Sequence, residues 1–189
     1  MCDFGGIKMA NMMEKVVFFL TVDGFDSKAF SALWQCFGNL NAWVQTASFN
    51  AADEIKSMDG SVNTHSDRSF NEVYALPFDV IVISDGITAN AIKDDPDVKA
   101  VLKKAADESA AIVVIDDGVS ALIPSGLLNG ATVAAPDYMK EALESAGAKL
   151  SDQPIVESDN IFSARADADM QELCSMVADY ITTKRQEVA

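Results

Sequence analysis

The sequence is poor in the residues that build metal centres and disulfide frameworks. Its 189 residues include one histidine, and the three cysteines, Cys2, Cys36 and Cys174, lie far apart with no CxxC pair. Neither a zinc site nor a disulfide-stapled fold is therefore expected, and we interpret Cys36 and Cys174 as unpaired core residues. Such cysteine usage favours a reducing compartment, so we predict a cytoplasmic location.

Basic residues and long apolar runs are also scarce. The chain has 14 Lys and Arg residues against 29 Asp and Glu residues, which gives a net charge of −15. This charge repels phosphate backbones and anionic lipid, so we expect neither nucleic acid nor a membrane as a partner. The longest apolar runs, Val16–Leu20 and Ala110–Ile115, are far shorter than the ~18 residues of a membrane span.

The first residues do not resemble a secretory signal. Asp3, Lys8 and Glu14 interrupt any apolar stretch before a cleavage site. We therefore expect residues 1–14 to be a leader outside the fold. Residues 15–189 have the length and the apolar content of a single globular domain.

Apolar runs alternate along the chain with stripes of apolar residues at helical spacing. The runs Val16–Val22, Asp79–Ser84 and Ala111–Ile115 are typical of strands buried on both faces, as in a parallel sheet. The alternation predicts an α/β sandwich on a mostly parallel sheet. Further strands are expected at Ala42–Phe49 and Ala131–Ala135, hairpins at 53–65 and 155–163, and helices after Asp26, at 69–76, 97–109 and 119–123, after Pro136 and after Asp167.

Acidic turns follow the buried strands. Asp26 lies soon after the first strand, Asp85-Gly86 follows the Asp79–Ser84 strand, and Asp116-Asp117-Gly118 follows the Ala111–Ile115 strand. Ligands of open α/β sheets bind beyond the carboxyl ends of the strands. A strand that enters a tight turn with a nearby glycine and then a helix has the shape of a nucleophile elbow. Asp116 would be the elbow residue, and we predict a positive φ there.

Four segments in this order resemble the ThiJ/PfpI family of the class I glutamine-amidotransferase-like superfamily. They are KVVFFLTVDGFD, FDVIVISDGI, SGLLNGATV and IFSARADADMQELCSMVADYI, and the resemblance covers about Lys15 to Ile181. It implies a three-layer α/β/α sandwich of the flavodoxin-like type and a homodimer. The family includes the parkinsonism-linked deglycase, and its members commonly use a cysteine nucleophile at the elbow.

The elbow of this chain departs from the family pattern. The family reads Ala-Ile-Cys-His-Gly or Ala-Ile-Cys-Ala-Gly, whereas the matching string here is Val114-Ile115-Asp116-Asp117-Gly118. A carboxylate is a weak nucleophile compared with a thiolate. Asp85 stands in the turn that helps to form the family's oxyanion hole, where an anion would repel the oxyanion. Protease, amidase or deglycase activity by the family's mechanism is therefore not expected.

Two functions remain open. The first is a non-catalytic protein that binds a small ligand or a protein partner at the strand-end pocket. The second is an enzyme with carboxylate chemistry, such as a hydratase, lyase or hydrolase, with Asp116 as base or nucleophile and Asp26 or Asp85 sharing its proton. The residues that we expect to line the pocket are Asp85, Gly86, Asp117, Gly118 and Arg165.

No cofactor is expected for either function. If the chain binds a metal ion, the candidate ligands are the four carboxylates of the acidic turns, which suit Mg²⁺ or Ca²⁺. They are Asp26, Asp85, Asp116 and Asp117.

Overall fold

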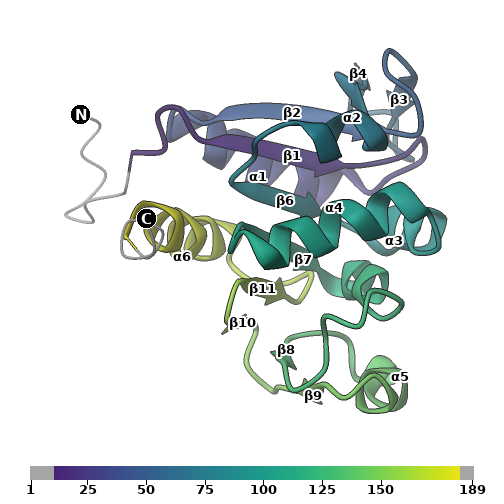
Figure 1. Cartoon of the computed structure of the whole chain (residues 1–189), viewed down its shortest axis with the longest axis vertical. Coiled ribbons are helices and arrows are strands. Elements are labelled where there is room, and N and C mark those ends of the chain that lie inside the picture. The colour runs from purple at the N-terminus through teal and green to yellow at the C-terminus, as the bar shows by residue number, and fades with distance from the viewer. Residues whose placement is uncertain (1–10, 184–189) are drawn as a thin grey trace.

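A computed structural model describes residues 11–183 and shows a seven-stranded sheet with helices on both faces (Figure 1). All strand pairs in this sheet are parallel except the pair at one edge, which is an antiparallel hairpin. The predicted α/β sandwich on a mostly parallel sheet is confirmed. The strands, in order across the sheet, are β10 (Ile155–Ser158), β11 (Ile161–Ala164), β7 (Ala111–Ile115), β6 (Val80–Ile83), β1 (Val16–Leu20), β2 (Trp43–Ser48) and β5 (Arg68–Ser69).

Helices form the two outer layers. One face of the sheet packs against α1 (Ser27–Asn39) and α6 (Met170–Thr183). The other face packs against α2 (Phe70–Ala75), α3 (Gly86–Ile92), α4 (Pro96–Asp107) and the 3-10 helix η1 (Asp116–Leu122). The remaining elements are the pair β3 (Glu54–Lys56) and β4 (Asn63–His65), the pair β8 (Thr132–Val133) and β9 (Lys149–Leu150), and the helices η2 (Asp137–Met139) and α5 (Lys140–Ser145).

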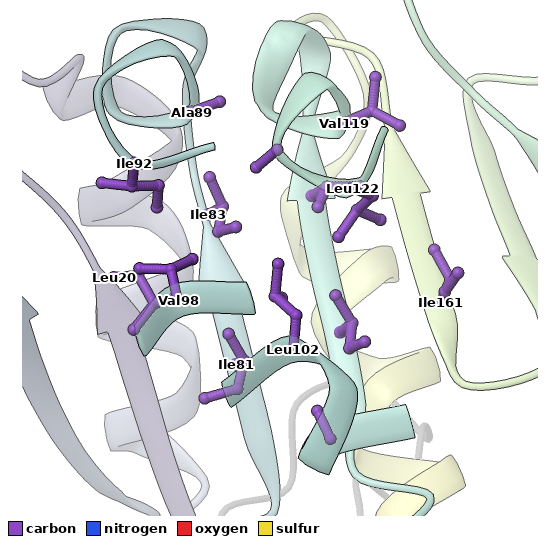
Figure 2. Packing of buried hydrophobic residues seen from close by; sticks show 14 of the residues in the cluster. Leu20, Ile81, Ile83, Ala89, Ile92, Val98, Leu102, Val119, Leu122 and Ile161 are labelled. Carbon is purple, nitrogen blue, oxygen red and sulfur yellow. The ribbon is translucent and has the colours of Figure 1, made fainter. Parts of the chain in front are cut away.

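Alternation along the central strands separates two apolar cores. In β6, Ile81 and Ile83 belong to the core under α4, whereas Val80 and Val82 belong to the core under α1 and α6. Successive side chains of a strand point to opposite faces, so a strand covered on both sides must be apolar throughout. Figure 2 shows the first core, in which Leu102 of α4 lies over the strands.

The helix starts follow local capping signals. The carboxylate of Asp26 accepts a hydrogen bond from a backbone N–H of the first turn of α1, and Ser69 and Glu72 form the predicted capping box of α2. The start of α6 differs from the prediction. Its capping carboxylate is Asp169 rather than Asp167. Asp169 accepts hydrogen bonds from the backbone N–H groups of Gln171 and Glu172, the second and third residues of the helix.

At three segments the structure differs from the secondary structure expected from the sequence. The sequence pattern does not indicate α3, a short helix whose side chains show no long apolar stripe. The predicted 119–123 helix is the 3-10 helix η1 and begins at Asp116. The predicted strand at Ala131–Ala135 is β8, which pairs with β9 in a small separate sheet at one end of the molecule (Figure 1). Local propensity identifies such a strand but does not say which partner it meets.

Part of the expected leader packs against the domain. Met12 is buried, and its backbone N–H donates to the carbonyl of Leu40 over 2.8 Å. Residues 11–14 therefore contact the fold, and the rest of the predicted leader lies outside the described residues. No helix within residues 11–183 is long and apolar enough to cross a membrane.

Two cysteines form a disulfide that the sequence analysis did not predict. Cys36 of α1 and Cys174 of α6 are bonded, with their Cα atoms 6.5 Å apart. The prediction of unpaired core cysteines rested on their separation of 138 residues along the chain. It is wrong because both helices cover the same face of the sheet, which brings distant positions together.

Candidate functional site

Asp116 occupies a sharp turn at the carboxyl end of β7. Its φ is 54°, in the left-handed region that residues other than glycine rarely adopt, whereas Ile115 before it is extended. The chain therefore passes from a buried strand into η1 through one residue of unusual conformation. This confirms the predicted elbow backbone, and aspartate tolerates that conformation better than a β-branched residue does.

Two glycines allow α3 and η1 to approach closely at this turn. A Cβ atom added to Gly86 would lie 2.4 Å from Cβ of Asp117, and one added to Gly118 would lie 2.7 Å from the carbonyl oxygen of Ile83. Both distances are too short for a real side chain, so glycine is required by space at each position. The turns that follow β6 and β7 are thus in direct contact.

Asp85 is engaged in capping α3. Its side chain is buried, with 5% of its surface exposed. The carboxylate accepts hydrogen bonds from the backbone N–H of Thr88 at 2.8 Å, from the hydroxyl of Thr88 at 3.0 Å and from the hydroxyl of Ser84 at 3.3 Å. Burial raises the pKa of Asp85, and this effect is larger than the opposite effect of the hydrogen bonds, which lower the pKa. Asp85 therefore has a structural role that needs no ligand.

The half-buried carboxylate of Asp116 has acidic neighbours. Its oxygen accepts a hydrogen bond from the backbone N–H of Ala166, 3.3 Å away in the segment after β11. Burial raises the pKa of Asp116, and the negative charges of Asp117 and Asp167 raise it further. From the sequence, Asp26 or Asp85 was expected to share the proton of Asp116. The acids that act on Asp116 are instead Asp117 and Asp167.

Tyr138 and Arg165 bring further polar groups to this edge. The hydroxyl of Tyr138 donates to the carboxylate of Asp117, and this bond raises the pKa of Tyr138 to about 12. The guanidinium of Arg165 lies 3.1 Å from a carboxylate oxygen of Asp137 and donates to the carbonyl of Ser151. Arg165 therefore pairs with Asp137, an exposed residue outside the predicted site, rather than with an acid of the elbow. Tyr138 and its neighbour in η2 were missed, because no local pattern places that helix beside the elbow.

Asp26 does not lie beside Asp116 at the elbow. Its exposed carboxylate accepts a hydrogen bond from the backbone N–H of Lys28, and β6 lies between β1 and β7 in the sheet. Within residues 11–183, no group of three or more His, Cys, Asp or Glu side chains is placed to hold a metal ion. The four carboxylates considered as ligands therefore do not converge there.

The fold is a flavodoxin-like α/β sandwich with a strand-to-helix elbow at the carboxyl end of β7. The model of the DJ-1/PfpI family matches residues 14–179. The chain belongs to the DJ-1/PfpI family, as the resemblance to ThiJ/PfpI sequences implied.

Individual proteins are similar to the chain in sequence or in fold. The chain is 27% identical over 161 residues to the glutathione-independent glyoxalase DJ-1 of Schizosaccharomyces pombe, covering 81% of this chain and 83% of that protein. Drosophila melanogaster DJ-1beta shares the fold with a TM-score of 0.80 at 22% identity, over 93% of this chain and 95% of the other. A protein of Anabaena variabilis with DJ-1/ThiJ/PfpI-like and ferritin-like domains gives a TM-score of 0.83 at 19% identity, covering 89% of this chain and 48% of that one.

Proposed function

We propose that this chain is a non-catalytic member of the DJ-1/PfpI family that binds a small organic ligand or a protein partner beside the elbow. The observation that carries the proposal is the elbow itself, where Asp116 holds the strained position after β7. We propose that Asp116 stands where the family has its nucleophilic cysteine, which the similarity of Val114-Ile115-Asp116-Asp117-Gly118 to the family's elbow string supports. Cys36 and Cys174 offer no substitute thiol, because they are bonded to each other in the α1–α6 layer.

The charge around the elbow supports binding over acyl transfer. Asp116, Asp117 and Asp167 place negative charge where an acyl-transfer enzyme needs hydrogen-bond donors for an oxyanion. The ring of Tyr138 is largely exposed, at 74%. It offers an apolar surface beside the carboxylate of Asp117, to which its hydroxyl donates. A ligand that carries both a polar hydrogen-bonding group and an apolar part would match this combination.

The alternative is an enzyme that uses Asp116 as a general base. The raised pKa of this carboxylate favours it, since a base works best when its pKa is near the working pH. Asp117 replaces Asp26 as the acid beside it. A hydratase, lyase or hydrolase acting on a small polar substrate would fit that arrangement.

Ligand binding and turnover can be separated by one substitution. We expect a thermal-shift screen of metabolites, run with and without Mg²⁺, to find a ligand that raises the melting temperature by about 5–10 °C at 100 times its dissociation constant. Asp116→Asn should abolish this shift because it removes the charge at the elbow. The matched control is Asp179→Asn, which removes the same charge from an exposed position on α6 and should keep the shift.

Assays of turnover distinguish the non-catalytic binding protein from the enzyme. Under the proposal, hydratase, lyase and hydrolase assays with the ligand give background rates. Turnover by the wild-type protein that Asp116→Asn removes would contradict the proposal and establish the alternative. A shift that both variants retain would place binding away from the elbow.

The raised pKa of Asp116 also predicts a pH dependence of stability. Its pKa in the folded protein lies above the ordinary value of 3.8, so the folded state binds this proton more tightly than the unfolded chain does. The ionised group therefore destabilises the fold at pH values above the folded pKa, and this effect disappears as the pH falls below 3.8. We expect Asp116→Asn to melt at a higher temperature than the wild type at pH 7 and at an equal temperature near pH 3. Thermal unfolding between pH 3 and pH 8 measures the difference, and a difference that grows toward low pH would contradict it.

Assembly and location remain proposals. A homodimer is favoured by the family resemblance and by large apolar side chains that the single chain leaves exposed, such as Trp43 and Met58. The proposed cytoplasmic location rests on the residue composition. The Cys36–Cys174 disulfide is the observation that weighs against a strongly reducing compartment.

A further inference from the structure

We propose that the Cys36–Cys174 disulfide is a redox-controlled clamp on the C-terminal helix. In the oxidised protein the bond holds α6 on α1. In the reduced protein α6 becomes the first part of the fold to open. The proposal rests on the position of the bond and is independent of any ligand at the elbow.

The bond joins two helices from opposite ends of the described chain. Cys36 lies near the end of α1, Cys174 lies in the second turn of α6, and the two are 138 residues apart in sequence. Both side chains are buried, with 3% and 0% of their surfaces exposed, among apolar residues of the same core. The clamp therefore closes most of the chain into one covalent loop, and long loops lose the most conformational entropy when they are closed.

The topology makes α6 able to open separately from the sheet. It follows β11 through residues 165–169 and contributes no strand, so every strand pair remains intact if the helix leaves. The connecting segment includes Ala166, whose backbone N–H donates to Asp116. Opening of α6 should therefore also loosen this hydrogen bond at the elbow.

The exchange chemistry requires one external disulfide, such as oxidised glutathione. The thiolate of one cysteine attacks it, forms a mixed disulfide and releases one glutathione thiolate. The second cysteine thiolate then attacks the protein sulfur of the mixed disulfide, forms Cys36–Cys174 and releases the second glutathione. The protein loses two electrons and two protons, and the external disulfide is reduced to two thiols. Burial of both sulfurs means that either direction needs α6 to move away from α1.

The clamp can be tested on the full chain without disturbing the packing. Cys2→Ser leaves only the clamp pair as thiols, and this protein is refolded in oxidised or in reduced glutathione. Alkylation in denaturant should find no free thiol in the first sample and both thiols free in the second. The oxidised form should melt about 5–15 °C higher, as expected for closing a long loop. Native oxidised protein should resist a reductant that acts quickly in denaturant.

Hydrogen exchange locates the effect. Amides of residues 170–183 should exchange at least about tenfold faster in the reduced protein and through a local opening. Amides of β7, a fully buried strand that exchanges through global unfolding, should accelerate only as much as the lower global stability of the reduced protein requires. The triple variant Cys2→Ser, Cys36→Ala, Cys174→Ala should behave alike in both glutathione buffers. Free thiols that persist after oxidative refolding would overturn the proposal. Equal exchange of α6 in the two states would overturn it as well, and the reduced protein provides this comparison even if the triple variant fails to fold.

Discussion

Replacing Gly118 by alanine is expected to destabilise the protein by about 2–3 kcal/mol, in the range of overpacked buried sites. The new Cβ would lie 2.7 Å from the carbonyl oxygen of Ile83, which is backbone at the end of a buried strand. That oxygen cannot move without shifting the turn at Asp85 and the start of α3. Equilibrium unfolding in urea, followed by circular dichroism, measures the loss.

The matched control for this variant is Gly38→Ala. Gly38 lies in α1, and a Cβ atom there would meet nothing within 4 Å. Alanine should stabilise the protein at this position by up to about 1 kcal/mol, because it favours the helix. The two substitutions thus have opposite expected signs. If both stabilise the protein, the close contact between the elbow and β6 is absent.

Replacing Leu102 by alanine should cost about 3–4 kcal/mol, one of the largest effects expected for a single substitution in this chain. Leu102 is fully buried on the inner face of α4, in the apolar core over β6 and β7 (Figure 2). Truncation removes apolar contacts and leaves a cavity that the packed strands cannot easily fill. Urea unfolding should show a lower midpoint with an unchanged slope.

The control for the core variant is the next residue along the same helix. Lys103 is exposed, so Lys103→Ala keeps the helix propensity and removes no buried contact. We expect a change within about 0.5 kcal/mol. A loss of similar size in both variants would show that α4 tolerates no substitution and that the Leu102 result does not report on the core.

The central strands could be predicted because a strand that is buried on both faces must be apolar at nearly every position. Ala111–Ile115 was predicted with the bounds that the structure shows, and Asp79–Ser84 with one extra residue at each end of β6. The elbow backbone at Asp116 was also predictable. A buried strand that turns at once into a helix needs an unusual conformation at the junction, and the acidic turn with its glycine marks the place.

The surroundings of the elbow could not be predicted in the same way. Asp26 and Asp85 were expected beside Asp116 because all three follow strands, but both carboxylates cap helices. Capping and ligand binding use the same residue types at the same edge of the sheet, so sequence position alone does not distinguish them. Tyr138 reaches Asp117 only through the course of η2, which no local pattern determines.

The sequence by itself determined the class of fold, the central strands and the elbow, since each depends on neighbouring residues and on which faces must be apolar. The tertiary structure alone decided which distant side chains meet. The disulfide Cys36–Cys174 and the pair Arg165–Asp137 join residues whose separation along the chain carries no information on their distance. The physical reason is that strand order and helix placement, which bring such residues together, result from packing of the whole core rather than from any local preference.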